Sequence, residues 1–130
     1  MSRTVARGWA TVELERAAAE LGGALAVGTG FEPADPSTAL GARCLLGAAA
    51  DGSGRIVLLE PDREGPIAAF LARHGEGWAA TWLDAADADD RGLLVATDGA
   101  TPGPLGPERL EPGSPRGPFR LQVAPATIGQ

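Results

Sequence analysis

The segment from Arg55 to Leu83 constrains the fold of this chain more than any other part of the sequence. It opens with a short apolar run, Ile56–Leu59, which is rich in branched residues and typical of a buried strand. Pro66 suits the first position of a helix, an apolar face follows at i, i+3 and i+4 spacing, and Gly75 favours a left-handed helix end. The alternating run Trp78–Leu83 is typical of a second strand. The segment therefore predicts a strand, a short helix and a strand.

Three parts of this segment resemble the centre of a vicinal-oxygen-chelate domain, where a strand ends in Leu-Leu-Glu-Pro before a short helix and a Gly-Glu-Gly sequence. Here they are Leu58-Leu-Glu-Pro61, the helix from Pro66 to His74, and Gly75-Glu-Gly77. The superfamily includes glyoxalase I, methylmalonyl-CoA epimerase, extradiol dioxygenases and bleomycin-type resistance proteins. The resemblance implies an α+β fold in which two βαβββ modules form a cupped mixed sheet around a cavity.

The chain is long enough for one domain of this kind and too short for a second. The resemblance places the first module at residues 1–62, the linking helix at 63–75 and the second module at 76–125. Local patterns add further expectations. They predict a first strand at 7–13 with a helix after it, a loop at 31–38, a helix at 84–98, and strands near 108–110 and at 119–123.

Composition excludes some classes of partner. A formal net charge of −6 disfavours nucleic acid and anionic membranes. No stretch reaches membrane-spanning length, so a cytoplasmic protein is the expectation. The only cysteine, Cys44, is expected to pack as a small apolar side chain. The absence of Lys, Asn and Tyr beside abundant Ala, Gly, Arg and Pro suggests a GC-rich genome, such as that of an actinobacterium.

Catalytic members of the superfamily bind a divalent metal through side chains on the first and last strands of each module. This chain has a single histidine, His74, and a divalent ion needs about three or four protein ligands. The resemblance places apolar residues at most ligand positions: Ala6 (or Arg7 with a shift of one residue), Val57 and Ala80, with Gln122 as the nearest polar candidate. We therefore expect no metal and no other cofactor.

The tryptophans are the main candidates for ligand contact. If Ala80 faces the cavity, strand alternation directs Trp78 and Trp82 into it as well. Indole faces in a cleft suit a flat apolar ligand, although either ring could instead fill the core. The predicted ligand-binding set is Trp78, Trp82, Ala80, Trp9, Val57 and Gln122.

Three titratable residues are candidates for proton transfer if the chain is an enzyme: Glu60, His74 and Glu13. Each has an ordinary alternative. His74 falls at the end of the central helix, where it interacts favourably with the helix dipole, and the two glutamates fall beside turns.

These features favour a metal-free protein that sequesters a hydrophobic aromatic natural product, as in antibiotic resistance or self-protection. The alternative is a metal-independent isomerase, cyclase or lyase of natural-product (polyketide-like) biosynthesis. Whether the chain is an enzyme stays open at this point. The resemblance also implies a homodimer, because small members of the superfamily commonly pair.

Overall fold

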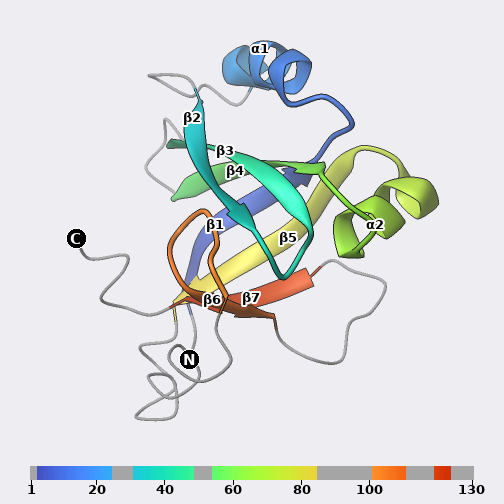
Figure 1. Ribbon diagram of the computed structural model, residues 1–130. Coiled ribbons are helices and arrows are strands. Elements are labelled where there is room, and N and C mark those ends of the chain that lie inside the picture. The colour runs from blue at the N-terminus through green and yellow to red at the C-terminus, as the bar shows by residue number, and fades with distance from the viewer. Residues whose placement is uncertain (1–2, 25–30, 49–53, 85–100, 111–118, 124–130) are drawn as a thin grey trace, which may run out of the picture.

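The computed structural model describes residues 3–24, 31–48, 54–84, 101–110 and 119–123 (Figure 1). In chain order its elements are β1 (Arg3–Ala10), α1 (Leu14–Ala24), β2 (Glu32–Ser37), β3 (Ala42–Ala48), β4 (Arg55–Pro61), α2 (Pro66–His74), β5 (Gly77–Asp84), β6 (Glu108–Leu110) and β7 (Phe119–Val123).

All seven strands belong to one mixed sheet in the order β2-β3-β4-β1-β5-β7-β6. The pairs β1–β4 and β5–β7 are parallel, and the other pairs are antiparallel. Figure 1 shows the sheet strongly curved, and its two edges are joined where the N–H of Thr38 donates to the carbonyl of Pro102 at 3.1 Å. The expected α+β fold with a cupped mixed sheet is confirmed.

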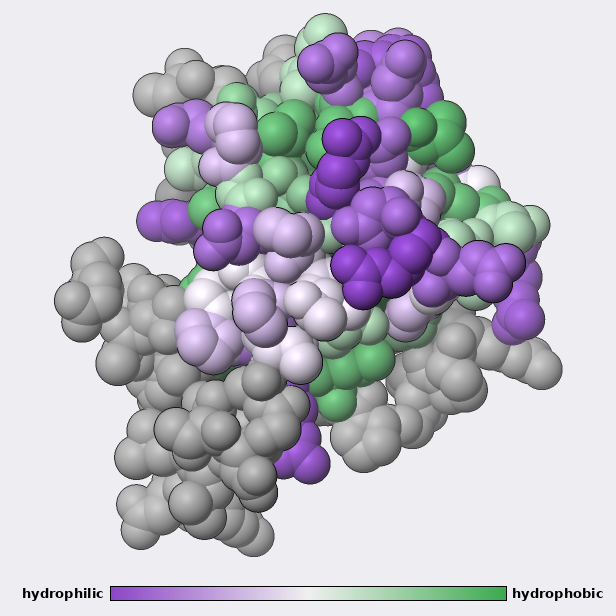
Figure 2. All heavy atoms as spheres, in the orientation of Figure 1, coloured by the Kyte–Doolittle hydropathy of each residue, from purple (hydrophilic) through white to green (hydrophobic). Residues whose placement is uncertain are grey.

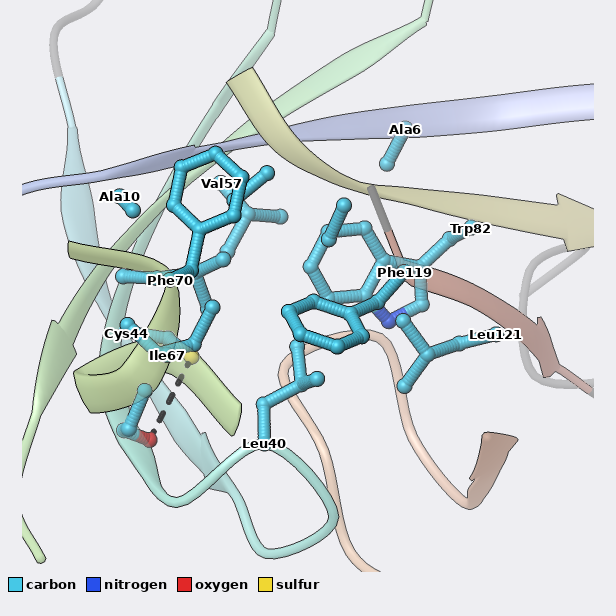
Figure 3. Packing of buried hydrophobic residues seen from close by; sticks show 14 of the residues in the cluster. Ala6, Ala10, Leu40, Cys44, Val57, Ile67, Phe70, Trp82, Phe119 and Leu121 are labelled. Carbon is cyan, nitrogen blue, oxygen red and sulfur yellow. Dashed lines mark hydrogen bonds between the residues drawn. The ribbon is translucent and has the colours of Figure 1, made fainter. Parts of the chain in front are cut away.

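The two faces of the sheet bury different side chains. The inner face holds the larger core, in which Trp82, Phe119 and Leu121 pack beside Ile67 and Phe70 of α2 (Figure 3). On the outer face, α1 covers a smaller cluster that includes Leu14, Ala17 and Leu58, with Trp9 packed against it. This division follows from strand alternation, because neighbouring residues of β4 such as Leu58 and Leu59 point to opposite faces.

Two local expectations differ from the structure. The first strand ends at Ala10 rather than at residue 13, because Thr11 begins a turn in which its hydroxyl accepts a hydrogen bond from the N–H of Glu13 at 3.1 Å. The segment predicted as a loop at 31–38 contains β2, despite Pro33 and Pro36. An edge strand tolerates proline, since one row of its backbone groups has no strand partner. The predicted helix at 84–98 lies almost wholly outside the described residues.

The central strand–helix–strand segment agrees closely with the prediction. Ile56, Val57, Leu58 and Leu59 are all buried in β4, and α2 begins at Pro66. Gly75 ends α2 with a φ of 78°, and its N–H donates to the carbonyl of Leu71 at 2.9 Å. Within the described residues, no helix is long and apolar enough to cross a membrane.

Candidate functional site

A β-bulge in β5 separates the two tryptophans that were expected to point the same way. Gly8 of β1 pairs with Ala80, but the next residue, Trp9, pairs with Trp78, so Ala79 is the additional residue. A bulge of one residue moves the side chains of the preceding residues of the strand to the opposite faces of the sheet. Trp82 therefore points into the cup, while Trp78 lies on the outer face with 37% of its surface exposed. The expectation that Trp78 points inward is wrong.

Trp82 fills the middle of the cup. Its side chain is fully buried, and Figure 3 places its indole beside Phe119 and Leu121. Gly8 provides the space: a Cβ at this position would lie 2.7 Å from Cζ3 of Trp82 and 2.8 Å from Cδ1 of Leu59. The structure thus places Trp82 in the core, which was the other interpretation of this residue.

The most unusual polar group in the core is the carboxyl of Glu108, on edge strand β6. It is fully buried and accepts one hydrogen bond on each oxygen. Nε1 of Trp82 donates to Oε1 at 2.8 Å, and Oγ of Ser37 donates to Oε2 at 2.5 Å. Burial raises the pKa of Glu108 to about 7, against the opposing effect of the two hydrogen bonds. Ser37 is itself positioned by the N–H of Leu40, which donates to its Oγ at 3.2 Å.

Sequence reasoning did not find Glu108. It occurs between Gly- and Pro-rich segments in a strand of three residues, and no local pattern of the sequence distinguishes this buried glutamate from glutamates on the surface. Its partners are 71 and 26 residues away in the chain, so only the curvature of the sheet brings the three side chains together.

A cavity of about 270 Å³ lies beside Glu108, where β2 meets the loop that leads into β6. The described residues that line it are Asp35, Thr101, Pro102, Gly103, Gly106 and Pro107. Gly103 lines the cavity and also packs against the buried carboxyl, because a Cβ on Gly103 would lie only 2.0 Å from Oε1 of Glu108. Figure 2 shows residues of intermediate hydropathy around this loop, whereas hydrophilic side chains gather over α1. A small ligand in the cavity would therefore be separated from Oε1 by a single glycine.

The loop around the cavity is held at both ends. Thr101 and Glu108 exchange two backbone hydrogen bonds of 2.8 Å each, which close the loop at its base. The N–H of Gly106 donates to the carbonyl of Gly103 at 3.1 Å and forms a turn at its tip. Together with the hydrogen bond from Thr38 to Pro102, these backbone hydrogen bonds hold the wall of the cavity in place.

The residues of the cup do not fit the divalent metal that the fold family implies. Ala6, Val57 and Ala80 are buried in the apolar core and have no donor atom in their side chains. Gln122 lies between Leu121 and Val123, which both face the core, so strand alternation directs it to the outer face. Among the described residues, no three His, Cys, Asp or Glu side chains are grouped closely enough to hold a metal.

The three predicted proton-transfer residues lie on separate elements and have other partners. Glu60 forms an ion pair with Arg43, and Glu13 lies 3.4 Å from the guanidinium of Arg16. His74 is exposed at the end of α2, where its ring packs against that of Phe70 with centroids 4.8 Å apart. The structure does not bring these three residues together.

Trp9 and Trp78 form an aromatic cluster on the outer face. Their ring centroids are 5.1 Å apart in an edge-to-face arrangement, and the guanidinium carbon of Arg7 lies 4.4 Å from the Trp78 ring centroid. This is a favourable cation–π contact. The cluster is on the opposite side of the sheet from Glu108.

Cys44 is buried as expected, and burial raises the pKa of its thiol to about 12. A thiol in this state is a poor nucleophile. Its role is therefore that of a small core residue.

Comparison with solved structures agrees with this architecture. Methylmalonyl-CoA epimerase from Mycobacterium tuberculosis is 22% identical, with a TM-score of 0.71, and the match covers 95% of this chain and 87% of that one. A hypothetical protein from Bacillus halodurans is 22% identical, with a TM-score of 0.68, covering 95% and 94%. A variant of Streptomyces coelicolor methylmalonyl-CoA epimerase, in complex with 2-nitronate-propionyl-CoA, is 23% identical, with a TM-score of 0.66, covering 97% and 99%.

These matches confirm the vicinal-oxygen-chelate fold. No protein-family model matches the chain, and no curated protein matches it either.

The same comparison corrects the expected function. The named neighbours are enzymes that act on an acyl-CoA, which contradicts a protein that sequesters an antibiotic without chemistry. The comparison gives no support to the alternative of a natural-product biosynthetic enzyme, since the named neighbours are methylmalonyl-CoA epimerases.

Proposed function

We propose that this chain is an enzyme that moves a proton on the carbon next to the carbonyl of a small acyl thioester, with Glu108 as the acid–base group. The observation that carries the proposal is the position of Glu108, a buried carboxyl with a pKa of about 7 that contacts the wall of a cavity. The thioester class is supported by the structural neighbours, several of which are methylmalonyl-CoA epimerases in complex with methylmalonyl-CoA or 2-nitronate-propionyl-CoA.

A pKa near neutrality suits this role. A general base works best when its pKa is close to the operating pH, since both protonation states are then populated. In the proposed reaction, Oε1 of Glu108 takes the proton through one bridging water molecule, because Gly103 separates Oε1 from the cavity. The electron pair of the C–H bond moves into the thioester as an enolate. The same proton, or one exchanged with solvent, then returns to the carbon. Trp82 and Ser37 hold the carboxylate in one orientation, and the missing side chain of Gly103 leaves room for this carboxylate against the cavity wall.

Deuterium exchange tests this proposal directly. The protein is incubated in D₂O with propionyl-CoA and, separately, with methylmalonyl-CoA, and mass spectrometry follows the label at the α-carbon. We expect incorporation into at least one of them with the wild type, and a loss of about 10²-fold or more with Glu108→Gln.

The control for this experiment is Glu60→Gln, which changes a carboxylate that is paired with Arg43 and should leave the rate unchanged. Equal rates for wild type and Glu108→Gln would contradict the role of Glu108. Absence of exchange with both thioesters would contradict the reaction itself.

Three finer points concern the assembly, the location and the ligand of the protein. We propose that two chains pair through the outer face, since Val12 and Trp78 are the large apolar side chains left exposed among the described residues. Residence in the cytoplasm and an aromatic, hydrophobic ligand remain predictions.

A further inference from the structure

The cavity beside Glu108 has an unusual balance of charge for a site that would take an acyl thioester. Of the described residues that line it, one carries a carboxylate, Asp35, and none carries a positive charge. Building on the proposed function, we infer that the acyl group admitted to this cavity carries no negative charge, so that the enzyme selects uncharged acyl thioesters and rejects carboxylated ones.

Hydrogen-bond donors in the cavity point to the same selection. An anion is normally held by Arg or Lys side chains or by free backbone N–H groups. Pro102 and Pro107 have no N–H, and the N–H groups of Thr101 and Gly106 already donate to the carbonyls of Glu108 and Gly103. Among the described lining residues, the Thr101 hydroxyl remains as an uncharged donor, so the lining offers a substrate carboxylate few donors and no positive charge.

Charge repulsion adds to this deficit. A carboxylate on the acyl group would lie between exposed Asp35 at the rim and Glu108 beneath Gly103. Because Asp35 is exposed, water screens the repulsion, and like charges about 4 Å apart in water disfavour binding by about five- to tenfold. An uncharged acyl group such as propionyl meets neither the repulsion nor the shortage of donors.

A matched pair of truncated thioesters measures this preference without the charges of CoA. S-propionyl-N-acetylcysteamine is neutral, and S-methylmalonyl-N-acetylcysteamine carries one negative charge at neutral pH. Each is titrated into the full chain by calorimetry. We expect the neutral compound to bind about five- to tenfold more tightly, and Asp35→Asn to reduce that ratio severalfold.

The control variant is Asp62→Asn. Its carboxylate pairs with Arg63 and is not part of the cavity lining, so its removal should leave the ratio unchanged. Equal or tighter binding of the anionic compound to the wild type would overturn the inference, as would a ratio that Asp35→Asn does not alter. Failure of both compounds to bind would overturn it too.

Binding and exchange separate this inference from the proposed function. Preferential binding of the neutral thioester without deuterium exchange would contradict the proton transfer and leave the charge selection standing. Exchange that is equally fast with propionyl-CoA and methylmalonyl-CoA, together with equal binding of the truncated pair, would contradict the charge selection and leave the proton transfer standing.

Discussion

Glu108 shows how a single residue can couple protein stability to pH. Its pKa in the folded protein is about 7, against an ordinary value of 4.5, because the fold removes the carboxyl from water. Between these two pH values the folded state binds more protons than the unfolded state, so stability falls as pH rises through this window and levels off above pH 7. The difference between the folded and unfolded pKa values of Glu108 lowers the free energy of unfolding by about 3 kcal/mol at pH 8.

Glu108→Gln should remove that cost. The amide has no charge to bury, its oxygen can still accept from Trp82, and its nitrogen can donate to Ser37. We expect the variant to be more stable than the wild type by about 2–3 kcal/mol at pH 8 and roughly equal to it at pH 4.5, as measured by urea unfolding. A variant that is less stable than the wild type at pH 8 would contradict a buried charge at this position.

At the scale of elements, Glu76 joins the start of β5 to the turn between β1 and α1. One oxygen, Oε2, accepts hydrogen bonds from the Thr11 hydroxyl at 2.7 Å, the Val12 N–H at 3.0 Å and Nη2 of Arg16 at 2.6 Å. The Val12 N–H, followed by the Thr11 hydroxyl and Arg16, lowers the pKa of Glu76. This contact lies at the turn in which β1 ends at Ala10 and the chain continues into α1.

Glu76→Ala should therefore destabilise the protein by about 1–2 kcal/mol at pH 7, because it removes an acceptor that takes three hydrogen bonds. The lowered pKa of Glu76 contributes stability above pH 4.5, and this stability is lost as the pH falls through the folded-state pKa. The difference in stability between the wild type and Glu76→Ala should therefore shrink below pH 4. Thermal unfolding at both pH values measures it. Glu20→Ala, which removes only an exposed partner of Arg16, should cost less than about 0.5 kcal/mol.

At the scale of the whole molecule, the curvature of the sheet leaves an inner face that is filled and an outer face that is partly exposed. Trp78 lies on that outer face beside Trp9, and Val12 is 61% exposed in the turn that Glu76 holds. Large apolar side chains exposed near one another are typical of an interaction surface. This supports pairing of two chains there.

Sedimentation velocity tests the pairing. The wild type should sediment as a dimer at micromolar concentration, and Trp78→Arg should shift it to the monomer by placing a charge in the contact. Arg73→Glu, an exposed charge reversal on α2, serves as the control and should leave the dimer intact. A monomeric wild type would rule out this interface.

The centre of the fold could be predicted from the sequence, because the signals there are local. The apolar run of β4, the proline that begins α2 and the glycine that ends it act over a few residues, and all three lie where they were predicted. The resemblance built on them led correctly to the cupped sheet. Proline content, in contrast, misled the prediction for residues 31–38, since the tolerance of β2 for proline depends on its place at the edge of the sheet.

The location of the candidate site, in contrast, depends on contacts between segments that are distant in the sequence. One bulge residue, Ala79, moves Trp78 to the outer face, and a bulge depends on pairing with a strand about 70 residues earlier. The high pKa of Glu108 depends on the burial that closure of the sheet produces, and the position of its carboxyl depends on Ser37 and Trp82. Such properties arise from contacts between distant segments and from removal of water, and neither is encoded in a local pattern of residues.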